Sequence, residues 1–144
     1  MTVKHCHGFD LDQPGKDSWR HRHEGGALRT VMAGPRDFAV MGGWAEEELP
    51  LSDLVERFLW DADLVLAEGF KGAPEPKIEV YRSEVRDAPL FDPDEAPSLQ
   101  TVALVTDDQA AECPLPVFSL GDPGMIASLA DFVEERLGLR RPRE

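Results

Sequence analysis

Apolar positions along this chain fall into short runs that Gly, Pro and charged residues interrupt. Short runs with β-branched side chains predict strands, and apolar residues at spacings of three and four predict helices. Strands are predicted at residues 2–5, 28–33, 38–41, 64–67, 77–82, 101–105 and 115–118. Helices are predicted at residues 18–25, across residues 52–59, and from Asp122 or Gly124 to Gly138. This alternation indicates an α/β domain with a β-rich insert around residues 28–41.

The segment from Asp63 to Val80 carries the most informative pattern. Residues 64–67 form a continuous apolar run, which is typical of a strand buried on both faces of a parallel sheet. Glu68 follows at the carboxyl end, where open α/β sheets bind their ligands. Gly69 allows a sharp turn or the close approach of a ligand, and Lys71 can reach a phosphate. A strand end with solvated charges is the simpler interpretation, and a lone Glu-Gly pair favours it.

The helix predicted at residues 18–25 has Asp17 or Ser18 as its capping residue and ends at Gly25 and Gly26. Lys16 precedes its amino end, where free backbone N–H groups and the helix dipole attract anions. An ordinary capped surface helix is the competing interpretation, and this segment alone favours it.

Turn and stop signals define several other elements. Gly34 and Pro35 lie between two predicted strands and indicate a hairpin or a bend. Ser52 can cap the second helix, and Gly138 stops the last one.

The composition is that of a single domain. The chain has 144 residues, the length of one domain, and 42% of them are apolar, which is enough to bury a core. No apolar run approaches the length of a membrane span, and we expect no signal peptide, so a cytoplasmic protein without membrane contact is predicted. Cys6 and Cys113 form no disulfide framework, which also agrees with a reducing compartment.

Charge is unevenly distributed along the chain. Residues 1–36 carry six Lys and Arg against four Asp and Glu, a balance of +2, so the total of −13 leaves −15 for the remainder. Nucleic acid is therefore not expected as a general partner, because its phosphates would meet an acidic surface. A small anion bound by the N-terminal part agrees with this distribution.

The histidines, together with Cys6, are candidates for a metal site: His5, His7, His21 and His23. The first two can share a strand face, but the last two point about 200° apart on a helix and cannot face one ion. No C-x-x-C or H-E-x-x-H pattern occurs, so a polar, anion-accepting loop is favoured over structural zinc. A Ser-His-Asp hydrolase has still less support, because G-x-S-x-G is absent and Ser18 is better explained as a cap.

Three segments, taken in order, resemble one protein family. They are VKHCHGFDLDQPGKDSWRHRHEGG at residues 3–26, DLVLAEGFKGAPEPKIEVYR at 63–82 and VALVTDD at 102–108. They are similar to the MobB family of molybdopterin-guanine dinucleotide biosynthesis adaptor proteins, which belong to the P-loop NTPases. The resemblance covers roughly residues 2–110. It implies a three-layer α/β fold with a mostly parallel sheet and a hairpin-type insert, as one MobB-like domain over residues 1–144.

The resemblance implies a GTP-binding protein of molybdenum-cofactor biosynthesis. Such a protein acts beside the MobA-type nucleotidyltransferase, which attaches GMP to molybdopterin. By position, Glu68 resembles the acid at the end of the Walker B strand, which would hold Mg²⁺ through water or orient a water near the γ-phosphate. Asp17 is the implied second acid for Mg²⁺.

The same resemblance implies the remaining ligand-binding residues. Lys16 and Lys71 would balance the phosphate charge of GTP, with Ser18 and Gly69 beside them. Asp107 would accept hydrogen bonds from the N1–H and N2–H₂ groups of guanine, a donor pair that adenine does not offer.

The chain departs from the family pattern at its start. The family begins with a strand, a G-x-x-x-x-G-K-[ST] loop and a helix, whereas this chain starts at the following strand and contains no such loop. The backbone of that loop cradles phosphates and its Ser or Thr binds Mg²⁺, so at most a weak GTPase is expected. Either the reading frame starts at an internal Met, or this is a paralogue that has lost the loop.

Two functions of different classes are left open. The first is a nucleotide-handling protein that binds GTP and Mg²⁺ at the carboxyl ends of the strands. The second is a non-catalytic adaptor that binds the MobA-type enzyme or molybdopterin without a nucleotide. A homodimer is compatible with both.

Overall fold

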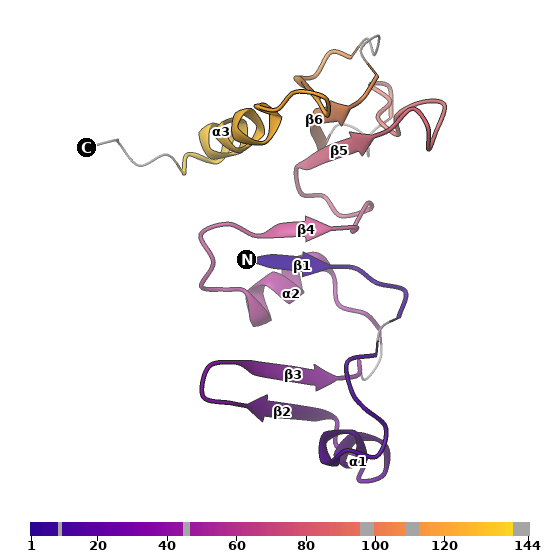
Figure 1. Cartoon of the computed structure of the whole chain (residues 1–144), viewed down its shortest axis with the longest axis vertical. Coiled ribbons are helices and arrows are strands. Elements are labelled where there is room, and N and C mark those ends of the chain that lie inside the picture. Colours follow the sequence, from indigo (N-terminus) through magenta and orange to yellow (C-terminus); the bar gives the residue numbers. More distant parts are fainter. Residues whose placement is uncertain (9, 45–46, 96–99, 109–112, 140–144) are drawn as a thin grey trace, which may run out of the picture. The chain divides into compact units, whose positions relative to one another are not determined.

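The computed structural model describes residues 1–8, 10–44, 47–95, 100–108 and 113–139, which contain seven strands and three helices (Figure 1). The chain divides into two compact units, Met1–Lys71 and Gly72–Glu144, which are described separately. The expectation of a single domain stays a prediction. None of the described helices has the length and apolar character that spanning a bilayer requires.

The first unit contains one parallel strand pair, one hairpin and two helices. In chain order its elements are β1 (Thr2–Lys4), α1 (Asp17–His23), β2 (Arg29–Ala33), β3 (Phe38–Gly42), α2 (Leu51–Phe58) and β4 (Leu66–Glu68). Strand β1 pairs with β4 in parallel, and β2 pairs with β3 in an antiparallel hairpin. Helix α1 contacts β2.

The predicted hairpin is confirmed. Five residue pairs join β2 and β3, from Arg29 opposite Gly42 to Ala33 opposite Phe38. At the turn, the backbone N–H of Gly34 donates to the carbonyl of Asp37 at 2.8 Å. The Gly-Pro signal predicted the position of the turn and left a hairpin or a bend open, and the strand pairing shows that it is a hairpin.

Strand β4 lies where the apolar run at residues 64–67 predicted it, and it runs parallel to its partner. The prediction that this strand is buried on both faces is wrong. All three of its residues are exposed, and the side chain of Leu66 keeps 56% of its accessible surface. The reason is that, among the described elements, β4 contacts β1 extensively but no helix packs over it to the same degree, so its faces are left uncovered.

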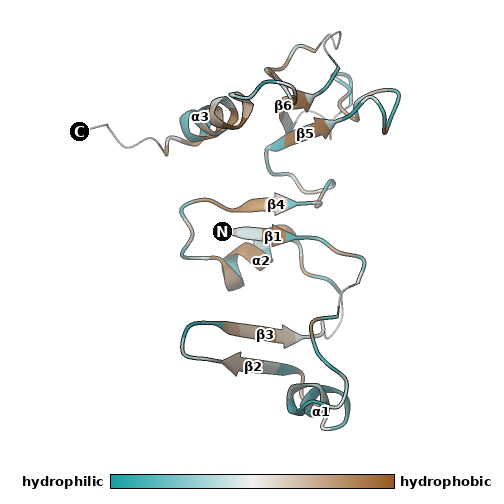
Figure 2. Cartoon of the chain, in the orientation of Figure 1, coloured by the Kyte–Doolittle hydropathy of each residue, from teal (hydrophilic) through white to brown (hydrophobic). Residues whose placement is uncertain are grey.

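The second unit contains most of the buried hydrophobic side chains in the described part of the chain. Its elements are β5 (Lys77–Tyr81), β6 (Thr101–Thr106), β7 (Val117–Ser119) and α3 (Met125–Leu137), and its sheet is parallel in the order β5-β6-β7. The central strand β6 is hydrophobic along most of its length (Figure 2), and Ala103 and Leu104 are completely buried. The strand buried on both faces is therefore β6, as predicted for residues 101–105.

Helix α3 packs on this sheet through an aromatic contact. The rings of Phe118 on β7 and Phe132 on α3 lie 5.6 Å apart between centroids. The helix ends at Gly138, which adopts the left-handed conformation with φ 65° and donates its N–H to the carbonyl of Glu135. The predicted stop at Gly138 is confirmed, because this conformation carries a steric penalty for residues with a Cβ.

The described elements confirm the predicted α/β class, with parallel strand pairs and an antiparallel hairpin insert. The predicted cap of the second helix is wrong. The structure has Pro50 at the N-cap of α2 without a side-chain cap, and the hydroxyl of Ser52 donates to Asp53 instead. Proline is tolerated there because its missing N–H is not needed at a helix start.

Candidate functional site

The carboxyl end of β4 presents an exposed charged pair. Glu68 is the last residue of the strand and lies opposite Lys4, the last residue of β1. Nζ of Lys4 lies 2.7 Å from Oε1 of Glu68, and the two side chains are 61% and 70% exposed. The hydrogen bond to Glu68, followed by the charge of that carboxylate, raises the pKa of Lys4. Glu68 therefore lies exposed at the carboxyl end of a strand, the position that the sequence predicted for it.

The backbone turns sharply directly after Glu68. Gly69 has φ +86°, and a Cβ at this position would lie 2.9 Å from Cβ of His5. Phe70 is also left-handed, with φ 47°, and its ring contacts the imidazole of His5 at 5.4 Å between centroids. The predicted sharp turn at Gly69 is confirmed. The turn places the backbone of Gly69 close to the side chain of His5, and Lys71, which follows the turn, is exposed.

His5 connects this turn to two other parts of the first unit. Its backbone N–H donates to the carbonyl of Glu68 at 2.9 Å, and its Nε2 lies 3.4 Å from Oε2 of Glu48. Its ring also meets that of His7 edge to face. Across the described ranges, no group of three or more His, Cys, Asp or Glu residues is arranged to hold a metal ion. His5 therefore acts as a support for the turn.

The loop before α1 is organised by Asp12, whose accessible surface is 9% of its maximum. Its Oδ1 accepts hydrogen bonds from the hydroxyl of Ser18 at 2.8 Å and from the backbone N–H of Gln13 at 3.1 Å. Among the described residues, its Oδ2 is buried without a hydrogen-bond partner. The Asp12 carboxylate needs hydrogen-bond donors from the protein, because burial removes the water molecules that would otherwise solvate it.

The prediction that Asp17 or Ser18 caps α1 is wrong. The N-cap is Lys16, and it makes no side-chain cap. A capping hydroxyl has to accept a bond from a backbone N–H, whereas the Ser18 hydroxyl donates to the buried carboxylate of Asp12. A hydrogen bond to a carboxylate is stronger than one between neutral groups, so the Ser18 hydroxyl bonds to Asp12 and not to the backbone N–H groups at the helix start.

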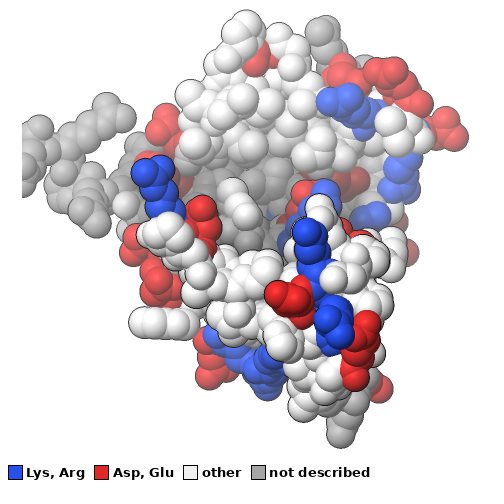
Figure 3. All heavy atoms as spheres, turned by 60° about the horizontal axis from the view of Figure 1, so that its bottom comes forward, with Lys and Arg blue, Asp and Glu red and all other residues white. Residues whose placement is uncertain are grey.

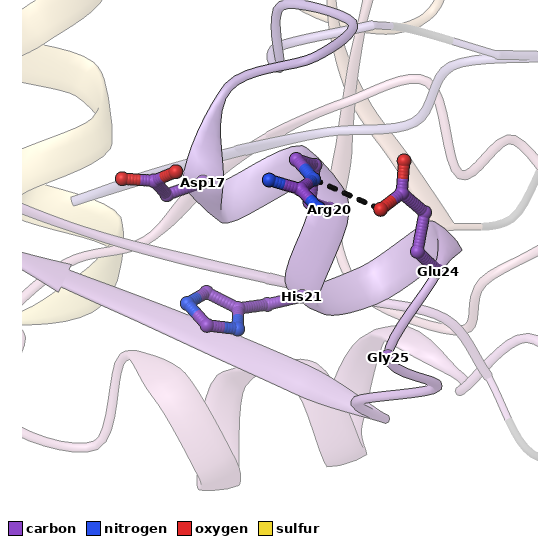
Figure 4. Close-up of a pocket in the computed structure, with 5 residues that line it drawn as sticks. All are labelled: Asp17, Arg20, His21, Glu24 and Gly25. Carbon is purple, nitrogen blue, oxygen red and sulfur yellow. Dashed lines mark hydrogen bonds and ion pairs between the residues drawn. The ribbon is translucent and has the colours of Figure 1, made fainter.

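Beside α1 lies a hollow of about 580 Å³, which Figure 4 shows together with its lining residues: Asp17, Arg20, His21, Glu24 and Gly25. All five residues are exposed. Nε of Arg20 lies 2.9 Å from Oε2 of Glu24, while the carboxylate of Asp17 points away from that pair (Figure 4). Arg20 therefore has its charge balanced by a neighbour one turn along the helix, which weakens its attraction for an anion.

In the second unit, Asp107 follows β6 at the carboxyl edge of the parallel sheet. Its Oδ1 accepts the backbone N–H of Ser83 at 2.9 Å. The ring of Tyr81 is buried at the end of the neighbouring strand, opposite Thr106. Burial first, and then the charges of Asp108 and Asp107, raise the pKa of Tyr81.

The structure brings some of the predicted site residues together and leaves others with different partners. Glu68 and Gly69 are adjacent to Lys4 and His5, whereas Ser18 is bonded to Asp12. In the described part of the chain, no hydrogen bond or ion pair joins Glu68 or Lys71 to residues 16–18. A shared phosphate site for these residues therefore stays a prediction, as does the role of Asp107.

Sequence reasoning did not identify the observed roles of four residues: Lys4, Asp12 and Tyr81, which it did not single out, and His5, which it considered only as a metal ligand or as part of an anion-accepting loop. Lys4 and His5 both bond to Glu68, more than sixty residues away in the sequence, so no local signal identifies these two contacts. Tyr81 carries a usable signal, because it is the only tyrosine of the chain and ends a predicted strand.

Basic and acidic side chains are interspersed on the face that Figure 3 displays. No block of one sign dominates that face.

Comparisons with known proteins agree with the resemblance seen in the sequence. The family model "MobB: Molybdopterin guanine dinucleotide synthesis protein B" matches residues 1–107. The molybdopterin-guanine dinucleotide biosynthesis adapter protein of Escherichia coli (strain K12) is 35% identical over 136 residues, which are 92% of this chain and 73% of that protein. The protein of that name from Haemophilus influenzae is 35% identical over 139 residues, which are 94% and 71% of the two chains.

The fold is similar as well. A crystal structure of molybdopterin-guanine biosynthesis protein B superposes with a TM-score of 0.63 and 27% sequence identity. The superposition covers 94% of this chain and 78% of that one. Sequence and fold therefore point to the same group of proteins.

Proposed function

This chain belongs to the MobB family of molybdopterin guanine dinucleotide synthesis proteins, and from this premise we propose that it is a GTP-binding adapter. Membership gives the chain a role in molybdenum cofactor biosynthesis. In the proposed role, the chain assists the attachment of GMP to molybdopterin. Two described cysteines, Cys6 and Cys113, are free thiols, which supports a cytoplasmic location.

The position of Glu68 carries the proposal. Its carboxylate ends a parallel strand, is largely exposed, and is followed by a turn that leaves Lys71 accessible. Ligands of open α/β sheets bind at this end of the strands. Mg²⁺ keeps most of its waters and needs only one or two protein carboxylates besides the phosphates of its nucleotide. In the part of the chain that the structure describes, Glu68 belongs to no larger acidic cluster, which is therefore compatible with a Mg²⁺-nucleotide ligand.

The remaining residues take roles that follow from their charge. When bound, Mg²⁺ would neutralise phosphate charge, with Glu68 and Asp17 as the acids that hold it through water. Lys16 and Lys71 would offset phosphate charge, and Asp107 would accept from the ring N–H and amino groups of guanine. Lys4 competes with the metal for Glu68, but exposed ion pairs are weak and exchange readily.

An adapter that works without a nucleotide is the second candidate. The bond from Ser18 to Asp12 favours it, because this hydroxyl is not available to a phosphate or to Mg²⁺ while it donates to the buried carboxylate.

The partners that we propose are a MobA-type guanylyltransferase, molybdopterin and a second copy of this chain. The relatives are named adapter proteins, which implies a partner in the same pathway. Self-association is supported by the hairpin, where Val31, Phe38 and Val40 are exposed on one face. Sedimentation velocity across a range of concentrations tests this part, and Phe38→Asp should shift the population toward the monomer. Trp60→Ser, which changes an equally exposed aromatic residue elsewhere, should not.

Calorimetric titration of the full chain with GTP, with and without Mg²⁺, tests the nucleotide-binding proposal. We expect weak binding that depends on Mg²⁺ and that Glu68→Gln largely abolishes. Glu56→Gln, an exposed acid on α2, is the matched control and should leave the binding unchanged. Absence of GTP binding would contradict the proposal and support the nucleotide-free adapter, and an unchanged Mg²⁺ dependence in Glu68→Gln would remove the metal role of Glu68.

A further inference from the structure

The loop before α1 contains a buried carboxylate with an unused oxygen. Asp12 keeps only 9% of its accessible surface. Its Oδ1 accepts the hydroxyl of Ser18 and the backbone N–H of Gln13, whereas its Oδ2, among the described residues, is buried and accepts no hydrogen bond. Within the same ranges, no Lys, Arg or His forms an ion pair with Asp12. Because buried carboxylates are normally paired with a cationic group or bound to a metal ion, the free oxygen indicates a cation.

A second carboxylate is held close to the first along the chain. Oδ1 of Asp10 accepts the backbone N–H of Asp12 at 3.1 Å, which folds the Asp10 side chain back over the loop. Asp10 is exposed, and a carboxylate has about four acceptor positions, so this single bond leaves most of its capacity for a ligand. Residues 10–18 carry three Asp against one Lys, so the loop attracts cations.

The spacing of the two acids agrees with cation binding. Asp10, Asp12 and Gly15 follow the pattern D-x-D-x-x-G, which is the first half of a calcium-binding loop. Gly15 adopts the left-handed conformation that the sharp turn of such a loop needs, with φ +82°. The second half of the pattern is missing, because Pro14 stands at the third ligand position and His21 at the position of the bidentate Glu. The spacing therefore supports two carboxylate ligands and not a full set.

We infer that Asp10 and Asp12 bind a hard divalent cation, Mg²⁺ or Ca²⁺, in the loop before α1. Both ions take oxygen ligands and complete their coordination with backbone carbonyls and water. In the described part of the chain, no group of three or more ligand-type side chains exists, so a site with two carboxylates is a weak one. We expect a Kd of about 0.1–1 mM, as in the weakest calcium-binding modules.

The surroundings of Asp12 allow an ion to enter. The residues on both sides of it, at positions 10–11 and 13–17, are exposed, so a small movement of the loop gives an ion access to Oδ2. Since the other oxygen of Asp12 accepts the hydroxyl of Ser18, a bound cation would fix the start of α1 to the loop. The site needs no nucleotide and does not include Glu68, so the inference goes beyond the proposed function and does not rest on it.

Calorimetric titration of the metal-free full chain, without nucleotide, tests the inference. The probes are CaCl₂ and MgCl₂ in separate titrations, and the two arms identify the ion that the site takes. We expect saturable binding of at least one ion. The melting temperature of the chain should rise with the concentration of the same ion, because an ion that binds only the folded chain stabilises it.

Three variants assign the binding to these residues. Asp12→Asn keeps the size of the side chain and should abolish the binding, while Asp10→Asn should weaken it about tenfold or more. Asp61→Asn, which changes an exposed acid elsewhere in the first unit, is the matched control and should leave the binding unchanged. The amide NMR spectrum shows whether each variant folds. If Asp12→Asn does not fold, the exposed Asp10 carries the test.

Paramagnetic broadening by Mn²⁺ locates the ion in the unmodified chain. Mn²⁺ prefers the same oxygen ligands, so the amide signals of residues 10–18 should broaden at the lowest Mn²⁺ concentrations. Broadening that is strongest around Glu68 would overturn the inference. So would the absence of saturable binding of both ions, or binding that neither Asp10→Asn nor Asp12→Asn weakens.

These titrations contain no nucleotide, so their result is independent of the GTP experiment. Cation binding at Asp10 and Asp12 without GTP binding would sustain this inference and reject the nucleotide-binding proposal. Mg²⁺-dependent GTP binding by a chain that binds no ion at these two residues would do the opposite.

Discussion

Lys4 and Glu68 face each other across the parallel β1–β4 pair, and Nζ of Lys4 lies 2.7 Å from Oε1 of Glu68. Both side chains are largely exposed, so the pair is screened by water and salt. This contact occupies the carboxylate that the proposed function assigns to Mg²⁺.

We therefore expect Lys4→Gln to lower the Mg²⁺ concentration needed for GTP binding by a few-fold, because the metal no longer competes with an ammonium group. The melting temperature should change little, since exposed ion pairs contribute little to stability. Calorimetric titration at several Mg²⁺ concentrations measures the first effect, and thermal unfolding measures the second. A weaker Mg²⁺ dependence in Lys4→Gln would show that Lys4 supports the ligand instead of competing with it.

Gly69→Ala should destabilise the chain by about 1–3 kcal/mol. The residue is left-handed, which costs a side chain with a Cβ about 1–2 kcal/mol, and the new Cβ would lie 2.9 Å from that of His5. Gly72→Ala is the control, because nothing lies within 4 Å of a Cβ there, and its effect should stay within about 0.5 kcal/mol. Urea unfolding measures both, and equal effects of the two substitutions would contradict the close approach.

Leu104→Ala should reduce the free energy of unfolding by about 2–5 kcal/mol, because this side chain is completely buried in β6 and its loss leaves a cavity. Leu66→Ala removes the same atoms from an exposed position on β4 and should cost about 0.5 kcal/mol or less. Chemical unfolding of the two variants compares the strands directly. A larger loss of unfolding free energy in Leu66→Ala than in Leu104→Ala would mean that the hydrophobic core depends on β4 more than on β6.

Ser18→Ala should destabilise the chain by about 1–3 kcal/mol, because it leaves the buried carboxylate of Asp12 with fewer donors. A double-mutant cycle with Asp12→Ala distinguishes this bond from helix capping. If the hydroxyl acts through Asp12, Ser18→Ala should have little effect in the Asp12→Ala background. Additive effects would support a capping role for Ser18 instead.

The raised pKa of Tyr81 predicts a loss of stability at alkaline pH. The folded chain holds the phenol in its neutral form, while the unfolded chain ionises near pH 10. This stabilisation is fully present below pH 10 and is lost as the pH rises from there through the folded pKa. Absorbance titration of the single tyrosine should give a pKa above its ordinary value, and Asp107→Asn should lower it. An ordinary pKa in the folded chain would contradict the burial of the phenol.

The sequence by itself determined where the elements lie and which family the chain belongs to. The Gly-Pro turn, the stop at Gly138 and the strand that ends at Glu68 were all predicted correctly. Each depends on neighbouring residues, whose backbone preferences and apolar spacing act over a few positions.

Only the tertiary structure decided which strand is buried and which groups meet. The apolar run at β4 resembles the one at β6, but burial depends on the strands that flank each of them, and β6 has a partner on both sides. Lys4 lies 64 positions from Glu68 in the sequence, and Ser83 lies 24 positions from Asp107. Contacts of this kind follow from strand pairing and register, which local sequence preferences do not specify.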